Sequence, residues 1–382
     1  MAYSFGSVRA MSVGEKLWRV HWPLLIVAAA IAAIGTAALY SVSGGSFQPW
    51  AERHALRFLV ATLIVILMAM IRPEFWLKAA YPVYAVVLIL LALVPLIGVG
   101  ALGARRWIGS GSFSFQPSEI MKLVLVLALA RYYQWLPAGK VSRPQWVLVP
   151  LAMIVVPVVL TLQQPDLGTA VLFAAAGLSM MFMAGTPIVY FLAGLAGAAA
   201  ASPFIWARLH DYQRRRIEIF MSPERDPLGS GYHIAQSKIA IGSGGLWGKG
   251  FLAGTQSRLD FVPEKHTDFI VTLLGEEWGF AGLIILLSLY ALMLVLMFAM
   301  ALRCRNRFAR LVITGTAVVL FVYVFINIAM VTGLVPVVGI PLPLVSHGGT
   351  SMMTLMVGLG LAMSVYVHGR EPIRRDEIGV LW

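Results

Sequence analysis

The segment at 262–269 reads VPEKHTDF and gathers titratable side chains just before a long apolar run. Asp268 lies where the polar segment meets the apolar one. A carboxylate in that position can act as a general base if partial burial raises its pKa. The commoner role of such a residue is to cap the first turn of a helix, and Thr267 could do the same. Spacing alone therefore makes Asp268 a candidate base with capping as the alternative.

A second set of charges opens the apolar stretch at 117–136. Glu119 and Lys122 are three residues apart, so on a helix they share a face and can pair. Pro117 suits the first position of that helix. Ionisable groups inside a spanning helix are costly and mark functional sites by default. A structural ion pair that braces the helix bundle is the alternative, and the two roles can coexist.

Several basic residues could hold a phosphate group. Arg105 and Arg106 stand beside Trp107, and a guanidinium binds phosphate through two hydrogen bonds. Ordinary anchoring of Trp and Arg at a membrane interface is the alternative. Lys238 and Lys249 flank the glycine-rich run GSGGLWGKG at 242–250, whose backbone N–H groups could cradle phosphate. This run lacks the Walker order, and a flexible turn is the alternative.

Two further polar positions open apolar stretches. Asp166 precedes Leu167 and is expected to cap a helix there. The segment SHGGTS at 346–351 contains His347, which could titrate near neutral pH or be a hydrogen-bonded structural residue.

The composition points to lipid as the solvent for most of the chain. Of the 382 residues, 59% are hydrophobic and 12% are charged, whereas a soluble domain has about 45–50% and about 25%. The formal net charge is +12, but the basic residues lie in short segments between apolar spans, so no nucleic-acid partner is expected. The single cysteine, Cys304, excludes an intrachain disulfide and a thiolate metal cluster. The first apolar span is expected to serve as an uncleaved signal anchor.

The apolar pattern predicts an all-α polytopic membrane protein of about ten transmembrane helices, forming a single domain over 1–382. A spanning helix needs about 20 mostly apolar residues. The expected spans are 22–41, 55–71, 79–100, 117–136, 146–162, 167–184, 187–206, 269–302, 309–331 and 346–368.

Charge distribution predicts that both termini are cytoplasmic. Basic residues crowd the segments that would then lie inside, whereas the short outside loops and their helix ends hold only four arginines, Arg53, Arg57, Arg105 and Arg106. By this topology residues 207–268 form one large extracytoplasmic loop between helices 7 and 8. Loops of that length in a compact bundle are usually functional or disordered, and the apolar stretches in this one favour packing.

The eighth span is too long for one straight crossing. Residues 269–302 would extend about 51 Å as a helix, whereas the hydrocarbon core is about 30 Å thick. Glu276 and Glu277 lie in its first third between Gly275 and Gly279. We therefore expect 268–278 to be a separate outer segment, bent near those glycines.

Taken together, five segments resemble the SEDS family (shape, elongation, division and sporulation) of bacterial cell-wall proteins. They are FQPSEIMKL at 115–123, QQPDLGTA at 163–170, DPLGSGYHIAQSKIAIGSGGLWGKG at 226–250, VPEKHTDFIVTLLGEEWG at 262–279 and NIAMVTGLVPVVGIPLPLVSHGGTS at 327–351. They run in family order from the fourth span to the tenth. The third and fifth segments are similar to the rod-shape (RodA) branch more than to the division (FtsW) branch. One departure is His347, where the family usually has tyrosine.

The resemblance implies a ten-helix peptidoglycan glycosyltransferase of the inner membrane with its site facing the periplasm. Such enzymes polymerise lipid II and release undecaprenyl diphosphate during cell-wall elongation and rod-shape maintenance. The resemblance places the essential acid at Asp268, within the His266-Thr267-Asp268 motif, and the helical acid–base pair at Glu119 and Lys122. It also implies a class B penicillin-binding protein as partner, together with other elongation-complex membrane proteins.

Glycosyl transfer needs a base for the acceptor hydroxyl and positive charge for the departing diphosphate. Asp268 is the expected base, or the acid that orients the acceptor. The expected substrate-binding residues are Glu119, Lys122, Arg105, Arg106, Lys238, Lys249, His266, Thr267 and Ser346. No cofactor is required by the sequence, and a divalent cation such as Mg²⁺ or Mn²⁺ could share the diphosphate charge, although no dedicated cage is evident. The alternatives are a lipid II flippase and a non-catalytic scaffold for the penicillin-binding protein.

Overall fold

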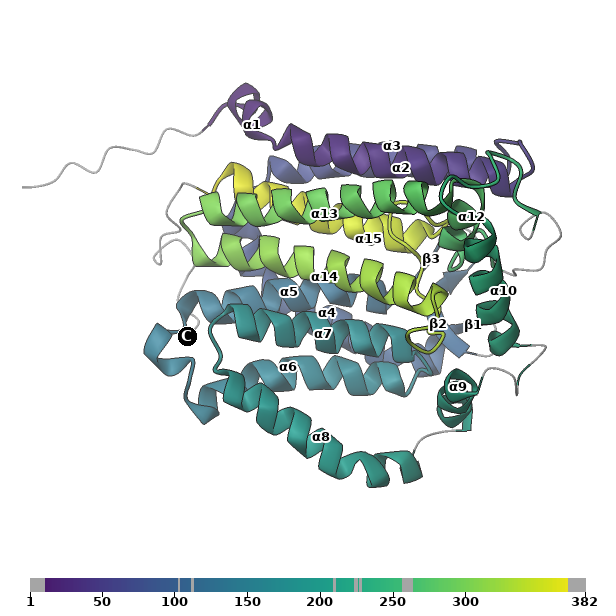
Figure 1. Cartoon of the computed structure of the whole chain (residues 1–382). Coiled ribbons are helices and arrows are strands. Elements are labelled where there is room, and N and C mark those ends of the chain that lie inside the picture. Colours follow the sequence, from purple (N-terminus) through teal and green to yellow (C-terminus); the bar gives the residue numbers. More distant parts are fainter. Residues whose placement is uncertain are drawn as a thin grey trace, which may run out of the picture.

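The structure is a computed structural model of the whole chain. It describes residues 11–369 apart from 102–103, 111–112, 209–210, 223–225, 227–228 and 256–263. Figure 1 shows a bundle of long helices that run roughly side by side, with shorter elements gathered at one end. The long helices are α2 (Trp22–Val42), α3 (Ala51–Ala69), α4 (Pro73–Ile97), α5 (Pro117–Trp135), α6 (Pro144–Leu162), α7 (Leu167–Met183), α8 (Ile188–Arg208), α13 (Gly279–Arg303), α14 (Arg307–Val331) and α15 (Gly349–Val367).

Each expected span coincides with one of these helices, so the helical polytopic fold is confirmed. By length and composition, six of the described helices can cross a membrane: α2, α4, α6, α13, α14 and α15. The helix α7 and residues 188–204 of α8 are shorter apolar helices. The helices α3 and α5 are more polar, because each carries an acidic and two basic residues along its length.

The helices α3 and α4 begin several residues earlier than expected, at Ala51 and Pro73. The expectation followed the apolar run, whereas a helix can continue past its apolar run into a charged turn. Conversely, α15 begins at Gly349, three residues later than expected, because 340–348 form turns rather than helix.

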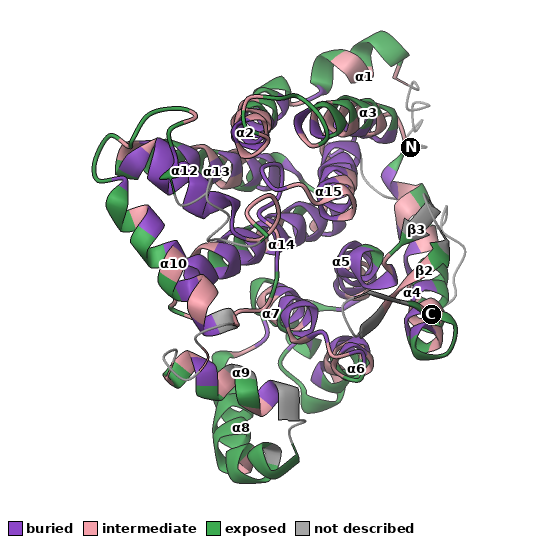
Figure 2. Ribbon diagram, turned by 90° about the vertical axis from the view of Figure 1, so that its right-hand side faces the viewer, coloured by how far each residue is buried: buried purple, intermediate pink, exposed green. Residues whose placement is uncertain are grey.

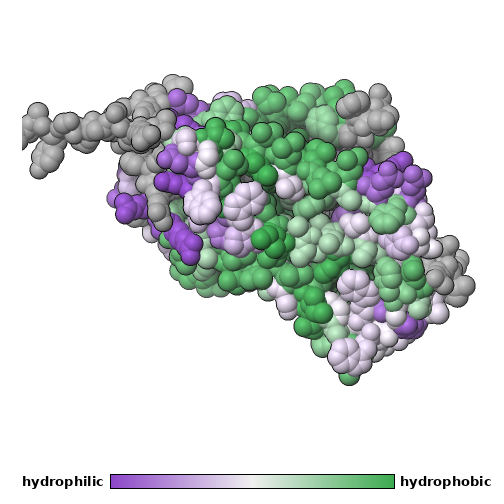
Figure 3. Space-filling model, turned by 90° about the horizontal axis from the view of Figure 1, so that it is seen from above, coloured by the Kyte–Doolittle hydropathy of each residue, from purple (hydrophilic) through white to green (hydrophobic). Residues whose placement is uncertain are grey.

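The core lies along α5, α14 and α15, whose residues are mostly buried (Figure 2). Lys122, Tyr133 and Phe308 are among the largest fully buried side chains. By contrast, α8 exposes most of its surface, including Leu195 and Phe204. A broad apolar band covers the side of the molecule between more hydrophilic ends (Figure 3), as expected for a surface that faces lipid.

One small sheet, which the sequence did not predict, interrupts this helical fold. Three short strands form an antiparallel sheet between α4 and α5: β1 (Val99–Ala101), β2 (Ala104–Ser110) and β3 (Phe113–Phe115). Val99 pairs with Trp107 and Ile108 pairs with Phe115. The β-branched and aromatic residues in these pairs suit short strands, and a search for spanning helices overlooks them.

The long segment 207–268 contains its own helices, α9 (Asp211–Met221) and α10 (Ser230–Ser243). These lie with the sheet and with α12 (Ile270–Glu277) at one end of the bundle (Figure 1). At the opposite end lie the short helices α1 (Val13–Arg19) and η1 (Ala138–Lys140).

The expected bend near Gly275 and Gly279 is present. The helix α12 ends at Glu277 and α13 begins at Gly279, which has a φ of +64°. The glycine-rich run at 242–250 packs its backbone against this bend: the N–H of Lys249 donates to the carbonyl of Glu276, and that of Gly250 to the carbonyl of Glu277, both at 3.0 Å. The glycines of this run therefore allow two backbones to approach closely.

Gly248 tests this packing. Its φ is +80°, and a Cβ built on it would lie 2.0 Å from the carbonyl oxygen of Glu277. We expect Gly248→Ala to destabilise the protein by about 2 kcal/mol or more, because backbone strain adds to the clash. The measurement is the midpoint of thermal unfolding in detergent. Gly242→Ala is the matched control, because no atom lies within 4 Å of its Cβ position. Equal midpoints for the two variants would contradict this account.

Candidate active site at one end of the bundle

Asp268 does not cap a helix. The N-cap of α12 is Phe269, and no side chain caps this helix. The hydroxyl of Thr267 instead donates to the carboxylate of Glu264 at 2.8 Å. Within the described residues, no hydrogen bond reaches the carboxylate of Asp268. The structure therefore removes the capping alternative for both Thr267 and Asp268.

The carboxylate of Asp268 is partly buried, and it lies against the loop before α15. A Cβ at Gly339 would be 3.2 Å from Oδ2 of Asp268, and Gly339 has a φ of +69°, a conformation that suits glycine. Burial, and to a smaller extent the negative charge of Glu264, raise the pKa of Asp268 to about 6. The group is therefore a carboxylate with a basicity suited to proton transfer near neutral pH.

Two hydrogen bonds hold the backbone on either side of this carboxylate. Nδ2 of Asn327 donates to the carbonyl oxygens of Asp268 at 2.9 Å and of Ile340 at 2.6 Å. The N–H of His347 donates to the carbonyl of His266 at 2.8 Å. The segment 266–268 is thus fixed to α14 and to the 340–347 turns, while its acidic side chain stays free of hydrogen bonds to described residues.

An aromatic cluster lies next to this segment. The ring of His266 stacks on Trp50 at 4.4 Å between centroids, and His347 meets the same tryptophan at 4.6 Å. Nη1 of Arg57 is 3.4 Å from Nε2 of His347. Burial and then the charge of Arg57 lower the pKa of His347 to about 4, so this histidine is neutral at physiological pH. A neutral ring packed against Trp50 and next to Arg57 fits the structural alternative for His347.

Ser346 supports the same turns. Its hydroxyl is buried and accepts a hydrogen bond from the N–H of Leu342 at 2.8 Å. The structure therefore brings four of the expected site residues into one region: Asp268, Thr267, His266 and Ser346. The hydroxyl of Ser346, however, already accepts a hydrogen bond within its own turn.

Glu119 and Lys122 form a buried ion pair, with Nζ of Lys122 at 2.5 Å from Oε1 of Glu119. The hydroxyl of Tyr323 on α14 closes the set: it accepts from Lys122 and donates to Oε2 of Glu119 at 2.8 Å. Lys122 is 2% exposed. The pair therefore braces α5 against α14 rather than presenting a free cation.

The helix α14 connects this pair to Asp268. Tyr323 and Asn327 are four residues apart, so they lie on one face of the helix about 6 Å apart along its axis. Sequence reasoning missed both residues. An asparagine within an apolar helix is a signal that could have identified Asn327.

The remaining basic candidates are held by other elements. Arg106 donates to the carbonyls of Gln164 and Pro165, in the tight turn before α7. That turn is also fixed by Asp166, which caps α7 as expected by accepting from the N–H of Thr169 at 3.2 Å. Arg105 pairs with Gly100 in the sheet, and its side chain lies outside the described residues.

The two lysines of the long segment differ from each other. Lys249 forms an ion pair with Glu276 at 2.7 Å, at the bend between α12 and α13. Lys238 is exposed on α10, and the end of its side chain lies over Gly333. In the described part of the chain, Lys238 makes no ion pair.

Separating the members of the buried pair tests its bracing role. Lys122→Met or Glu119→Gln alone leaves the remaining group without its charged partner, which costs about 3–5 kcal/mol for a buried pair. The double substitution removes both charges. We expect each single variant to lower the midpoint of thermal unfolding strongly, and the double variant to recover much of the loss. Additive losses in the double variant would contradict the bracing role.

Comparisons with known proteins agree with the motifs. Residues 21–371 match the FtsW/RodA/SpoVE family, described as cell cycle proteins. The chain is 42% identical over 350 residues to the peptidoglycan glycosyltransferase MrdB of Escherichia coli strain K12, covering 90% of this chain and 93% of MrdB.

Solved structures share the fold. One chain of a peptidoglycan synthase complex that coordinates polymerization and crosslinking superposes with a TM-score of 0.80 and 34% identity, covering 92% of this chain and 99% of that one. The rod shape determining protein RodA of Thermus thermophilus superposes with a TM-score of 0.70 and 30% identity, covering 92% and 98%. The resemblance seen in the sequence motifs is confirmed, and the chain belongs to the FtsW/RodA/SpoVE (SEDS) family.

Proposed function

We propose that this chain polymerises lipid II into glycan strands, with Asp268 as the general base and undecaprenyl diphosphate as the leaving group. The chain is a peptidoglycan glycosyltransferase of the RodA (MrdB) type, so the activity expected from the motifs is confirmed. The choice of substrate and the roles of individual residues are proposals. These proposals rest on the carboxylate of Asp268, which caps no helix and whose pKa is raised to about 6.

The reaction transfers a glycosyl group from a diphosphate to a hydroxyl. The 4-hydroxyl oxygen of the acceptor sugar bonds to the anomeric carbon of the donor as the bond from that carbon to the diphosphate oxygen breaks. The diphosphate departs with the electron pair, and Asp268 accepts the proton of the hydroxyl. A base with a pKa near 6 is mostly ionised at pH 7, yet it is basic enough to receive this proton.

The departing diphosphate needs positive charge nearby. Of the basic candidates whose side chains are described, Lys238 fits this role best, because it is exposed and makes no ion pair with described residues. Lys122, Lys249 and Arg106 hold other parts of the structure together. We propose that they act on the substrate indirectly, by fixing the elements around it.

A divalent cation remains a proposal as well. In the part of the chain that the structure describes, no three His, Cys, Asp or Glu side chains gather to hold a metal ion. Mg²⁺ commonly binds through one or two carboxylates and the substrate phosphates. The exposed carboxylate of Glu264 fits that pattern and leaves Asp268 free to act as the base.

We further propose that Asp268 faces the periplasm of a bacterial inner membrane. The positive-inside distribution supports this orientation, because outside the long segment 207–268 most basic residues lie in the short segments at the opposite end. A class B penicillin-binding protein is the proposed partner, since a similar chain occurs in a synthase complex that couples polymerization to crosslinking. Similarity to MrdB and RodA supports a role in elongation, alongside other membrane proteins of the same machinery.

The decisive variant is Asp268→Ala in the purified full chain. With lipid II, the cognate transpeptidase and moenomycin to silence unrelated glycosyltransferases, we expect glycan synthesis to fall by about 100-fold or more, because general base catalysis contributes about 10²–10⁴-fold. The unfolding midpoint should change little. Glu52→Gln is the matched control, because it removes an exposed carboxylate at the same end of the bundle.

Full activity in a well-folded Asp268→Ala protein would remove Asp268 from catalysis. If the unsubstituted chain moved lipid II between leaflets without making polymer, a flippase would be favoured. If it bound the transpeptidase but made no polymer, it would be a scaffold.

A further inference from the structure

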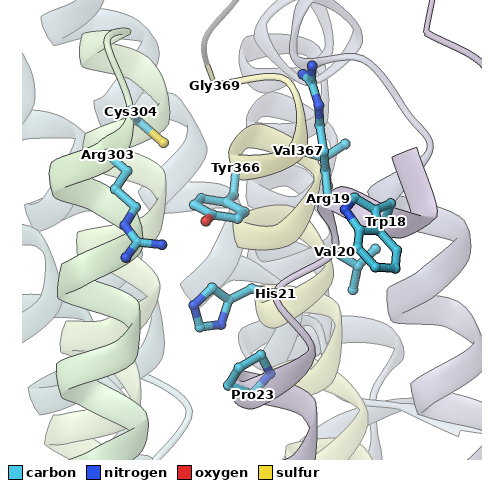
Figure 4. A pocket seen from close by; sticks show the side chains of 10 residues that line it. All are labelled: Trp18, Arg19, Val20, His21, Pro23, Arg303, Cys304, Tyr366, Val367 and Gly369. Atoms are coloured by element: carbon cyan, nitrogen blue, oxygen red, sulfur yellow. The ribbon is translucent and has the colours of Figure 1, made fainter. Parts of the chain in front are cut away.

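A cavity of about 360 Å³ lies at the end of the bundle opposite Asp268. Its walls come from the junction of α1 and α2, from the end of α13 and from the end of α15. Figure 4 shows Arg303 and His21 lying across from each other, with the ring of Tyr366 beside them. The reaction proposed above makes no use of this cavity.

The described residues that line the cavity give its wall a positive charge. Arg19 and Arg303 both line it, and none of the ten lining residues carries a carboxylate. Neither guanidinium makes an ion pair with any residue that the structure describes. Two arginines without acidic partners beside a cavity favour an anionic occupant, and guanidinium groups suit phosphate oxygens in particular.

His21 adds a polar group on the wall across from Arg303. Its ring meets Tyr366 edge-on at 5.5 Å, and its Nδ1 is buried without a hydrogen-bond partner among the described residues. Burial and then the charge of Arg303 lower the pKa of His21, so the ring is neutral near pH 7. A neutral imidazole can still donate one hydrogen bond to a phosphate oxygen.

The surroundings place the cavity at a membrane interface. Trp18 is 88% exposed and Trp22 is 44% exposed, and both flank the point where the apolar helix α2 begins. Tryptophan is enriched at the headgroup level of membranes. The helices α2, α13 and α15, which are long and apolar enough to span, all start or end at this level. Acyl chains could therefore continue along their apolar surfaces from a headgroup held in the cavity.

We propose that this cavity binds the phosphate headgroup of an acidic phospholipid from the leaflet opposite the catalytic side. Basic pockets between spanning helices are a recurrent setting for such headgroups. The volume of about 360 Å³ lies at the small end of the range of about 300–1,000 Å³ for ligand pockets, which suits a headgroup alone. Arg303 and Arg19 supply the charge, and His21 supplies a neutral donor.

The test measures lipid retained by the purified full chain in detergent by native mass spectrometry. Dioleoylphosphatidylglycerol and dioleoylphosphatidylcholine serve as acidic and neutral probes. We expect preferential retention of the acidic lipid. The affinity for it should fall about 5-fold for each arginine replaced, first in the single variant Arg303→Gln and then in the double variant that adds Arg19→Gln. Arg303→Lys should retain more lipid than Arg303→Gln. Arg143→Gln is the matched control, an exposed arginine that does not line the cavity.

Unfolding midpoints measured without lipid show whether each variant is folded. The same acidic-lipid retention in the folded double variant as in the unsubstituted chain would overturn the proposal. Soluble glycerol phosphate, added at the same concentration as the lipid, separates the two sources of phosphate. If it displaces the lipid and stabilises the protein equally well, the cavity is a site for soluble anions and the lipid proposal is wrong.

Discussion

The buried ion pair between Glu119 and Lys122, closed by the hydroxyl of Tyr323, is the interaction on which the catalytic end of the bundle depends. Charges buried in a bundle are costly unless each finds partners with good geometry, so this set favours the observed relative position of α5 and α14. Because Asn327 lies one turn further along α14, the same position determines where the carbonyl of Asp268 is held. The Glu119–Lys122 pair, expected from the sequence as a substrate-binding candidate, is thus linked to Asp268 through α14.

In the site, one set of groups holds the backbone in place and a different group, the carboxylate of Asp268, is available for chemistry. The backbone of 266–268 is fixed by hydrogen bonds from Asn327 and His347, and the ring of His266 rests on Trp50. The carboxylate of Asp268 receives no such support from described residues, and partial burial keeps its pKa high. The backbone is held in place, while the carboxylate is partly buried and caps no helix. This arrangement suits a base that must meet a substrate hydroxyl. The glycine-rich run at 242–250 contributes at a distance, by packing closely against the bend between α12 and α13.

The long helices could be predicted from the sequence because each coincides with a long apolar run. The break before Gly279 followed from comparing the length of the run at 269–302 with the thickness of a membrane. The small sheet could not, since its strands are short and lie between two spans. The Glu119–Lys122 pair followed from helical spacing, but its partner Tyr323 is 201 residues from Lys122 along the chain, and no local pattern indicates such a contact. Spacing favoured capping for Asp268, and only the position of Phe269 at the N-cap decides against it. The ion pair between Lys249 and Glu276 could not be predicted either, because 27 residues separate the two along the chain.

A pH–rate profile of glycan synthesis tests whether Asp268 accepts the proton of the acceptor hydroxyl with a pKa that burial has raised. The measurement is kcat/KM for purified lipid II between pH 5 and pH 8. The carboxylate must be ionised to act as a base, so the account predicts a plateau above a single ionisation near pH 6 and a fall of about tenfold per pH unit below it. The residual rate of Asp268→Asn should lack this ionisation. A profile of the unsubstituted chain that stays level down to pH 5, or an ionisation that persists in Asp268→Asn, would contradict the account.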